Sequence, residues 1–331
     1  MQDMIKRLLV RVYRKVVPLR IRAFRLKLLN KKAQKAVLTY YRTHMNDFDI
    51  ESKEDMVSVF LLVMRNGFSI FPEINKNRTN NYMNRKLKIE KEVSTGRLHV
   101  LLDDKKIFFP QNKIDAKGFR YLLNCLSLEQ DYNSPHRYFS NSHYFIGVLP
   151  QSIPKDDEII FGVDKGDFVV DAGAGEGNFS LSIIDKAEKV YLIESDPEWC
   201  EALKHTFANY KHKVEIIQKF LSDTDDKVNI SLRGLVELYN IPKIDFIKID
   251  VEGYERQVLR GGEGLLKTPF VNKIALCVYH KPEDETEFSQ LVSSWGYQYH
   301  LVDGYMVFIT GSEDNNPVRK GVLRAYRSIS T

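Results

Sequence analysis

The second part of the chain alternates between short apolar runs and helical stretches, and this alternation constrains the fold most. Five runs of strand character follow residue 158 with helical segments between them, and they read DFVVDAG, KVYLIES, KVEIIQKFL, IDFIKID and KIALCVYH. Apolar runs that alternate with helices are typical of a parallel sheet with helical crossovers. We therefore expect an α/β fold in this part of the chain.

The last predicted strands differ from these five. The stretch YQYHLVDGYMVFIT, residues 297–310, reads as two strands that turn at Asp303 and Gly304. Such a pattern predicts an antiparallel hairpin, which we expect to form the edge of the sheet. Residues 311–331 contain several basic side chains and no clear periodicity. They are predicted to form a flexible basic tail.

The first part of the chain has a different organisation. Residues 1–45 are predicted to form a basic amphipathic helical arm, because apolar residues recur there at helical spacing between Lys and Arg. Residues 46–130 are expected to form a small α+β accessory region. Within that region, alternating apolar and polar residues with turn signals predict an antiparallel meander near residues 87–109.

Basic residues are concentrated at the N-terminus. Residues 1–35 hold twelve Lys and Arg against one acid, a local charge of +11, so the rest of the chain carries −6 of the net +5. An apolar stripe flanked by basic residues predicts peripheral contact with an anionic membrane, or else a helix packed on the body of the protein. Basic and aromatic residues are not interleaved, so no nucleic-acid partner is predicted.

Composition sets the expected environment. The three cysteines lack the spacing of a zinc site or a disulfide framework, which is typical of a reducing compartment. No apolar run reaches the roughly 18 residues of a membrane span, and no secretory signal is recognisable. We therefore expect a cytoplasmic protein, with the inner membrane face as the place where residues 1–35 would make contact.

A glycine-rich turn follows the first of the five apolar runs. It contains Gly173, Gly175 and Gly177, with Asp171 before the glycines and Glu176 among them. The spacing is GxGxG and not the GxGxxG of dinucleotide sites. Carboxylates beside a pyrophosphate would be unfavourable, whereas they suit a cofactor with cationic groups. S-adenosylmethionine carries an ammonium and a sulfonium and no phosphate, so we predict it as the cofactor.

Two further positions are typical of such a cofactor site. Glu194 ends the second apolar run, where a carboxylate can accept hydrogen bonds from both ribose hydroxyls. Leu221 and Ser222 follow the third run, at the position that flanks the adenine in folds of this kind. The predicted cofactor-binding residues are therefore Asp171, Gly173, Gly175, Glu176, Gly177, Glu194, Leu221, Ser222 and Asp250.

These motifs together resemble the FkbM-type S-adenosylmethionine-dependent methyltransferases. The resemblance covers about residues 130–310 and rests on VVDAGAGEGNFSL, YLIESDP, IDFIKIDVEGYERQVLRGG and IALCVYHKPED. It implies a methyltransferase domain at residues 131–310 with the class I Rossmann-like fold, which is a seven-stranded, mostly parallel sheet with an antiparallel edge. It also implies methyl transfer to a hydroxyl oxygen, often of a sugar or polyketide.

The catalytic candidates lie at the ends of the last two parallel runs. Methyl transfer to a hydroxyl requires a residue that removes the acceptor's proton. We favour His280 as this base, because an ordinary histidine pKa of about 6.5 lies near working pH, and Asp250 is the alternative. Glu252 is a predicted acceptor contact, and Glu255 is expected to start a helix. A divalent metal on Asp250 and Glu252 is conceivable, but two carboxylates at this spacing are a weak signal and no metal is predicted.

The acceptor is less constrained than the cofactor. His136 and Arg137, in SPHRYF, are predicted to contact it, because the segment LEQDYNSPHRYF resembles one in a subgroup of the family associated with glycan gene clusters. We therefore expect an S-adenosylmethionine-dependent O-methyltransferase (EC 2.1.1.-) that acts on a sugar hydroxyl in surface glycan synthesis. The alternatives are methylation of a non-sugar acceptor, an NAD-dependent sugar oxidoreductase, and a non-catalytic module that only binds the cofactor.

Overall fold

The computed structural model describes part of the chain. The described residues are 35, 39, 89–102, 104–110, 145–146, 161–301, 305–307 and 318–327. The chain divides into two compact units, and the first, residues 1–71 and 307–318, lies almost entirely outside the described residues. The second unit, residues 72–306 and 319–331, contains nearly all of them. The predicted arm apart from residues 35 and 39, most of the accessory region, and His136 and Arg137 also lie outside the described residues.

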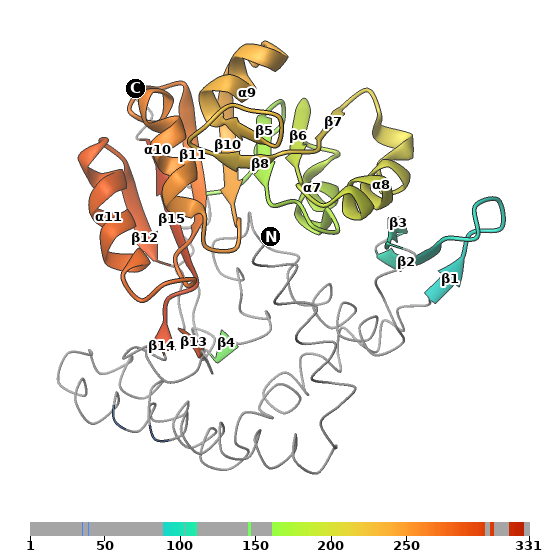
Figure 1. Cartoon of the computed structure of the whole chain (residues 1–331), viewed down its shortest axis with the longest axis horizontal. Coiled ribbons are helices and arrows are strands. Elements are labelled where there is room, and N and C mark those ends of the chain that lie inside the picture. The colour runs from blue at the N-terminus through green and yellow to red at the C-terminus, as the bar shows by residue number, and fades with distance from the viewer. Residues whose placement is uncertain are drawn as a thin grey trace. The chain divides into compact units, whose positions relative to one another are not determined.

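A seven-stranded sheet forms the centre of the second unit (Figure 1). The strands lie in the order β12-β15-β11-β10-β5-β6-β7. Their bounds are β5 Phe168–Ala172, β6 Lys189–Ile193, β7 Val214–Ile217, β10 Ile244–Ile249, β11 Val271–Cys277, β12 Gln298–Leu301 and β15 Val322–Tyr326. The five strands β7, β6, β5, β10 and β11 are parallel, and they coincide with the five predicted apolar runs. The predicted α/β fold is confirmed.

The antiparallel edge of the sheet is confirmed, but the predicted hairpin is wrong. β12 pairs antiparallel with β15, and β15 pairs antiparallel with β11, so β15 lies between them. The second predicted hairpin strand becomes β13 (Tyr305–Val307), which pairs with β4 (Phe145–Ile146) outside this sheet. β12 and β13, which the sequence pairs with each other, therefore belong to two different sheets.

The prediction of a flexible tail is wrong for residues 318–327, since β15 is an interior strand of the sheet. Val322, Leu323 and Ala325 are fully buried, and so is Arg324. The guanidinium of Arg324 lies 5.3 Å from the centre of the Phe161 ring. The sequence pattern was misleading because a buried arginine interrupts an otherwise apolar run, and an aromatic ring can accept such a cation. The sheet therefore extends beyond the predicted domain boundary at residue 310.

Five α-helices and one 3-10 helix connect the strands within the described residues. They are α7 Asn178–Ile183, α8 Pro197–Thr206, η1 Ala208–Tyr210, α9 Leu232–Tyr239, α10 Glu255–Leu266 and α11 Asp284–Ser294. Local chemistry fixes two of their starts. The Asp196 carboxylate accepts from the N–H of Glu198 at the start of α8, and the Ser231 hydroxyl accepts from the N–H of Gly234 in α9. Such caps satisfy N–H groups that have no partner within the helix.

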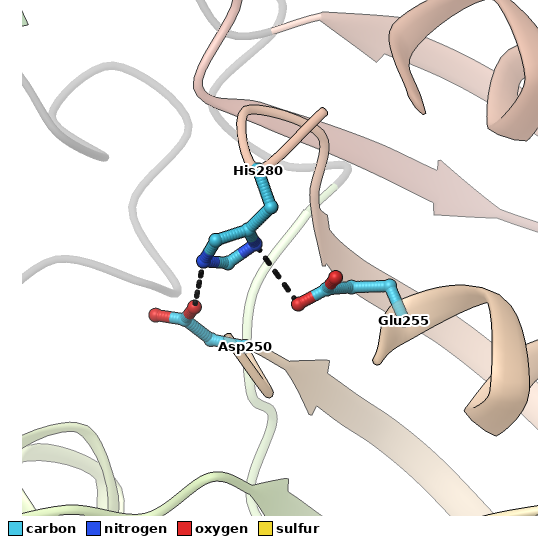
Figure 2. Close-up of side chains that lie close together, drawn as sticks. All are labelled: Asp250, Glu255 and His280. Carbon is cyan, nitrogen blue, oxygen red and sulfur yellow. Dashed lines mark ion pairs between the residues drawn. The ribbon is translucent and has the colours of Figure 1, made fainter. Parts of the chain in front are cut away.

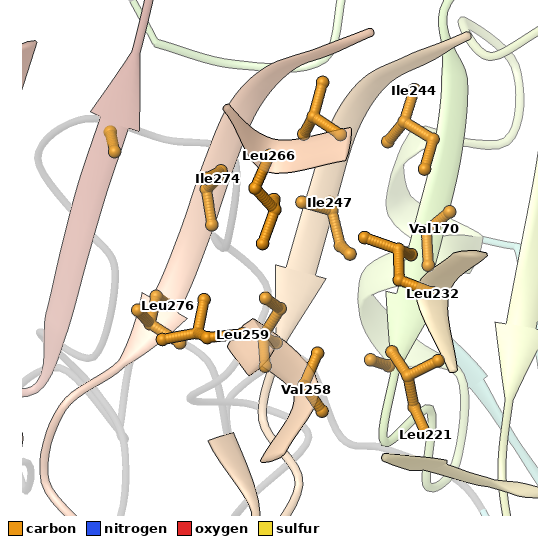
Figure 3. Close-up of a cluster of buried hydrophobic side chains, with 14 of the residues drawn as sticks. Val170, Leu221, Leu232, Ile244, Ile247, Val258, Leu259, Leu266, Ile274 and Leu276 are labelled. Carbon is orange, nitrogen blue, oxygen red and sulfur yellow. The ribbon is translucent and has the colours of Figure 1, made fainter. Parts of the chain in front are cut away.

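The main hydrophobic core lies between one face of the sheet and helices α9, α10 and α11 (Figure 3). Alternate residues of each strand face it; in β10 these are Ile247 and Ile249. Fully burying a side chain of this size contributes about 1.5–3 kcal/mol. The other residues of the same strands face the opposite side, and there the run of apolar residues is broken by Asp171 in β5 and Lys248 in β10.

Small sheets complete the described part of the chain. β1 (Ile89–Lys91), β2 (Leu98–Leu102) and β3 (Lys105–Phe108) form the predicted antiparallel meander, which is confirmed. The meander contacts α8, where the N–H of Phe108 donates to the Thr206 hydroxyl at 3.0 Å. β8 (Phe220–Ser222) pairs with β9 (Asn229–Ser231), and β14 (Val318–Arg319) precedes β15. None of the helices among the described residues has the length and apolar character needed to cross a membrane.

Candidate functional site

The strand order reverses between β5 and β10, and the loops that follow these two strands meet there. From β5 the chain proceeds to β6 and β7 on one side, whereas from β10 it proceeds to β11 on the other. In open α/β sheets, ligands bind outside the carboxyl ends of the strands at such a reversal. The glycine loop follows β5, and Asp250 follows β10. A Cβ atom on Gly173 would lie 1.8 Å from the carbonyl oxygen of Asp250, so only glycine allows this contact.

The other two glycines of the loop differ in what surrounds them. Both have positive φ angles, +53° at Gly175 and +78° at Gly177. A Cβ atom on Gly177 would lie 2.6 Å from the side chain of Leu203, whereas one on Gly175 would meet nothing within 4 Å. Gly177 therefore allows close packing against α8. Gly175 faces open space, which leaves room for a ligand close to the backbone.

The N–H groups of the glycine loop donate to the protein. Those of Gly173 and Ala174 donate to the carbonyl of Ile193 at 3.0 and 3.1 Å, and that of Gly177 donates to the carbonyl of Ala174. The N–H of Gly175 donates to the Glu194 carboxylate at 2.9 Å. A phosphate site needs such groups to point at the ligand. These four N–H groups are already bonded within the protein and do not point at a ligand.

A buried ion pair lies beneath the glycine loop, and its lysine was not predicted. The Lys248 ammonium donates to Asp171 Oδ1 at 3.0 Å and to the carbonyl of Gly173 at 2.7 Å. Asp171 Oδ2 accepts from the Ser180 hydroxyl at 2.6 Å. The two charged residues are direct cross-strand neighbours, so they necessarily share one face of the sheet. The signal in the sequence is a single lysine within the apolar run FIKI.

Glu176 adds a second carboxylate near the same lysine. Burial raises the pKa of Glu176 above its ordinary value, the positive charge of Lys248 opposes that shift, and the charges of Asp171 and Asp250 add to it. One ammonium therefore faces three carboxylates. A ligand that places a positive charge here would relieve the excess negative charge. This donor set fits the cationic cofactor predicted from the sequence and fits a pyrophosphate poorly.

Glu194 lies between the glycine loop and α8. Its two carboxylate oxygens accept from the N–H groups of Gly175 and Asp196 at 2.9 and 2.8 Å. Burial raises the pKa of Glu194, while these two hydrogen bonds lower it. Each oxygen retains a further lone pair for a hydroxyl donor. The position next to Gly175 is compatible with the predicted ribose contact.

The residues predicted to flank the adenine have less exposed side chains than expected. Leu221 is 3% exposed and belongs to the main core, so its side chain packs against protein. Ser222 is half-buried, and its hydroxyl donates to Asp223 at 3.3 Å. The backbone of Ser222 also lies against α10, where a Cβ atom on Gly261 would be 2.2 Å from the Ser222 carbonyl. The sequence did not reveal that β8 supports α10.

A second charged cluster follows β10 and β11, with His280 at its centre. His280 Nδ1 lies 3.0 Å from Glu255 Oε1, and His280 Nε2 lies 3.7 Å from Asp250 Oδ1 (Figure 2). Nε2 is also 3.7 Å from Glu252 Oε2. The Tyr279 hydroxyl donates to Asp250 Oδ1 at 3.1 Å. The predicted residues Asp250, Glu252 and His280 are thus brought together, and two further residues, Glu255 and Tyr279, join them.

The turn between β10 and α10 separates the carboxylates by exposure. Glu252 and Gly253 both have positive φ angles, +55° and +95°, which is uncommon for a glutamate. The side chain of Glu252 is 90% exposed, whereas that of Glu255 is 1% exposed. Glu255 is the first residue of α10, as predicted, but it also faces His280. Tyr254, which directly precedes α10, is 57% exposed.

The carboxylates change the protonation state expected of His280. Burial alone would lower the pKa of His280, but Glu252, Glu255 and Asp250 outweigh it and raise the pKa to about 10. An imidazole with this pKa is already protonated at neutral pH and cannot accept a further proton. The preference for His280 as the base was based on its ordinary pKa, and the three carboxylates remove that basis. Asp250, the alternative base, lies 14% exposed beside the glycine loop.

The same cluster has donor atoms of the kind that bind metals. One atom each from Asp250, Glu255 and His280 lie within 4.8 Å of one another. These atoms already pair with each other, and a protonated imidazole is not a metal ligand. The contacts that the structure shows among these three side chains are ion pairs.

The seven-stranded sheet with its antiparallel edge is the fold expected of a class I methyltransferase domain. Residues 170–299 match the model of the methyltransferase FkbM domain. The resemblance to the FkbM methyltransferase family seen in the sequence motifs is therefore confirmed over these residues. This match favours a methyltransferase over the alternative of an NAD-dependent oxidoreductase.

Known proteins match parts of the chain. The chain is 37% identical over 51 residues to ribosomal RNA small subunit methyltransferase A of Mycobacterium avium, which is 15% of this chain and 16% of that protein. Among solved structures, methyltransferase FkbM from Methylobacillus flagellatus is 20% identical, with a TM-score of 0.40, over 49% of this chain and 44% of that one. The RNA methyltransferase PH1948 from Pyrococcus horikoshii is 14% identical, with a TM-score of 0.32, over 50% and 76%. The chain thus spans less than half of the first structure and about a sixth of the Mycobacterium protein.

Proposed function

We propose that this chain is an S-adenosylmethionine-dependent O-methyltransferase that methylates a sugar hydroxyl in surface glycan synthesis. The observation that carries the proposal is the contact between the glycine loop and Asp250 at the reversal of strand order. It places a loop with room for a ligand beside a part-exposed carboxylate. A carboxylate in this position can remove the proton of an acceptor hydroxyl.

The residues around Gly175 would hold the cofactor. Glu176 and Asp250 would face its cationic groups, because Lys248 already neutralises Asp171. Glu194 would accept hydrogen bonds from the ribose hydroxyls while it keeps its two backbone donors. Gly173 and Gly177 would act through packing alone, since each leaves room for protein atoms. The four occupied N–H groups of the loop argue against a dinucleotide in this place.

When bound, the cofactor supplies an electrophilic methyl group, which the acceptor oxygen takes while the electron pair of the broken C–S bond stays on sulfur. Asp250 accepts the proton of the acceptor hydroxyl as the new O–C bond forms. His280 stays protonated beside Asp250 and places a positive charge 3.7 Å from Asp250 Oδ1. Glu252, exposed at the rim, is placed to accept a hydrogen bond from a second acceptor hydroxyl.

A polyol suits this arrangement, because carboxylates are hydrogen-bond acceptors and a sugar presents several donors. The contacts of His136 and Arg137 with the acceptor, and of residues 1–35 with a membrane, remain predictions. A lipid-linked glycan would give residues 1–35 a reason to contact a membrane.

The test is methyl transfer from labelled S-adenosylmethionine to extracted glycans and glycolipids, with mass spectrometry of the product. We expect label in a glycan fraction. Asp250→Asn should lower the rate about 10²–10⁴-fold, the usual contribution of a positioned base, without loss of affinity for S-adenosylhomocysteine. Asp185→Asn, which changes an exposed aspartate, serves as the control and should retain wild-type activity.

Three results would count against the proposal. Label in ribosomal RNA, included as an acceptor because of the short match to an RNA methyltransferase, would replace the sugar by a nucleic acid. If calorimetry detected binding of NAD but not of S-adenosylhomocysteine, S-adenosylmethionine would be excluded as the cofactor. Full activity of Asp250→Asn would exclude Asp250 as the proton acceptor.

A further inference from the structure

Glu255 connects His280 to the turn that carries Asp250. Its Oε1 accepts from the N–H of Val251 at 3.0 Å and from that of Gly253 at 3.4 Å. The same oxygen lies 3.0 Å from His280 Nδ1. Val251 and Gly253 belong to the turn that directly follows Asp250. A single buried carboxylate oxygen therefore holds both the backbone after Asp250 and the imidazole that faces Asp250.

Tyr279 approaches Asp250 from the neighbouring strand end. Its hydroxyl donates to Asp250 Oδ1, the same oxygen that lies 3.7 Å from His280 Nε2. The rings of Tyr279 and His280 lie 4.1 Å apart between centres and are tilted by 38°. Two groups that follow β11 thus converge on one oxygen of a carboxylate that follows β10.

We propose that Glu255 and Tyr279 are positioning residues of the methyltransferase site: Glu255 holds His280, and His280 and Tyr279 together fix the orientation of the Asp250 carboxylate. This inference rests on the proposed function of Asp250. The hydrogen bond from Tyr279 and the ion pair with His280 both act on Oδ1 and restrain the orientation of the Asp250 carboxylate. The proton acceptor of a displacement reaction must be oriented before the acceptor arrives. The pattern follows the general logic of catalytic sites, where a second residue orients the group that reacts.

Two conservative variants test the proposal. Tyr279→Phe removes one hydroxyl, and Glu255→Gln removes one charge at nearly constant volume. The matched controls are Tyr299→Phe in β12 and Glu263→Gln in α10, both at exposed residues away from the site. For all four, the methyl-transfer rate, the affinity for S-adenosylhomocysteine by calorimetry, and the thermal midpoint are measured. The titration of His280 is followed by ¹⁵N NMR, with His280→Gln used to assign its signals.

We expect Tyr279→Phe to lower kcat by roughly tenfold or more, which corresponds to the loss of one hydrogen bond to a charged group. Its affinity for S-adenosylhomocysteine should stay at the wild-type value. Glu255→Gln should lower kcat as well and move the titration of His280 toward its ordinary range. Both controls should match the wild type. Wild-type kcat in Tyr279→Phe and Glu255→Gln would overturn the proposal.

A purely structural role would produce a different pattern. In that case rate, cofactor affinity and thermal midpoint would fall together, and the proposal would be rejected. If the wild-type protein transfers methyl groups to no acceptor, the proposed function fails, but the NMR titration still decides the arrangement. An unchanged His280 titration in both Glu255→Gln and Asp250→Asn would then show that these residues do not hold the imidazole.

Discussion

The two charged clusters near the carboxyl ends of the strands contain the same kinds of charged group, but their side chains differ in exposure to solvent. Each has one cation among carboxylates: Lys248 with Asp171 beneath the glycine loop, and His280 with three carboxylates after β10 and β11. The side chains of Lys248 and Asp171 are 4% and 0% exposed. In the His280 cluster, exposure rises from 1% at Glu255 through 14% at Asp250 to 90% at Glu252.

The difference indicates different tasks. A fully buried pair cannot meet a substrate, and its bond to the carbonyl of Gly173 gives it a role in shaping the loop. In a cluster that extends from the interior to the surface, the buried side chains are fixed by packing and can restrain the exposed side chains that they contact. The first cluster would therefore determine stability and cofactor affinity, and the second would determine the rate. Three sets of measurements can break or sharpen this comparison.

The largest effect is expected from Lys248→Met. Removing one partner of a buried ion pair leaves an unpaired charge and typically costs about 3–5 kcal/mol. We expect urea denaturation to show a loss of this size, together with weaker binding of S-adenosylhomocysteine. The double variant Lys248→Met with Asp171→Asn should recover most of the stability, because no unpaired charge remains.

Arg233→Met is the matched control, since Arg233 pairs with Glu237 on the surface of α9. Exposed pairs contribute little, so no measurable change in unfolding is expected. If Lys248→Met were as stable as this control, the buried pair would not have the role assigned to it.

The second effect is a pH dependence that belongs to His280. Its pKa is about 10 in the folded protein and has an ordinary value of about 6.5. A raised pKa means that the stabilisation is complete below about pH 6.5 and is lost as the pH rises through about 10. The free energy of unfolding should therefore fall across this window by up to about 1.4 kcal/mol per pH unit. Chemical denaturation at a series of pH values measures it.

His280→Gln is the comparison for this titration. This variant should abolish the decrease in the free energy of unfolding between about pH 6.5 and 9. Burial raises the pKa of Cys200 and of Tyr297 to about 12, so these two groups affect stability only at higher pH. The rate of methyl transfer provides a second reading. A rate that increases as the pH rises through the His280 pKa would identify the neutral imidazole as the base and contradict its assignment as a fixed cation.

The smallest effects are expected at the glycines of the loop. Gly175→Ala should cost about 1–2 kcal/mol for its positive φ angle, and its methyl group would enter the open space where the cofactor is expected. Gly177→Ala adds a clash with Leu203 to the same backbone cost. We therefore expect Gly175→Ala to weaken S-adenosylhomocysteine binding more than stability, and Gly177→Ala to do the reverse. Calorimetry measures the loss of affinity and thermal unfolding measures the loss of stability. If the two losses stood in the same ratio in both variants, the distinction between Gly175 and Gly177 would be refuted.

The parallel strands could be predicted from the sequence, because a strand that is buried on both faces of the sheet appears in the sequence as a continuous apolar run. β15 could not be predicted in this way. A buried arginine concealed that strand, and the partner of an antiparallel edge strand depends on contacts that are distant in sequence. The turn signal at Asp303 and Gly304 predicted that its two flanking segments pair with each other. Such a signal does not reveal the partner of the second segment, which is β4.

Within the site, sequence reasoning named residues that the structure brings together, but it did not reveal several of their contacts. The glycine loop, Asp250 and His280 were located because strand ends in a parallel sheet converge. The protonation of His280 depends on Glu255, whose inward orientation follows from the positive φ angles at Glu252 and Gly253 and has no one-dimensional signature. Lys248 was overlooked because its partner, Asp171, is 77 positions away and only the sheet register brings them together.

The position of β15 also has a consequence for the order of events during synthesis. β12 ends at Leu301, but its hydrogen-bonding neighbour in the sheet begins only at Val322. A chain that emerges from the ribosome in order must therefore keep both β11 and β12 without their shared partner while some twenty further residues are added. During that interval two strand edges remain open to incorrect pairing, as unpaired edges generally do. Insertion of β15 between them is a late step that closes the sheet.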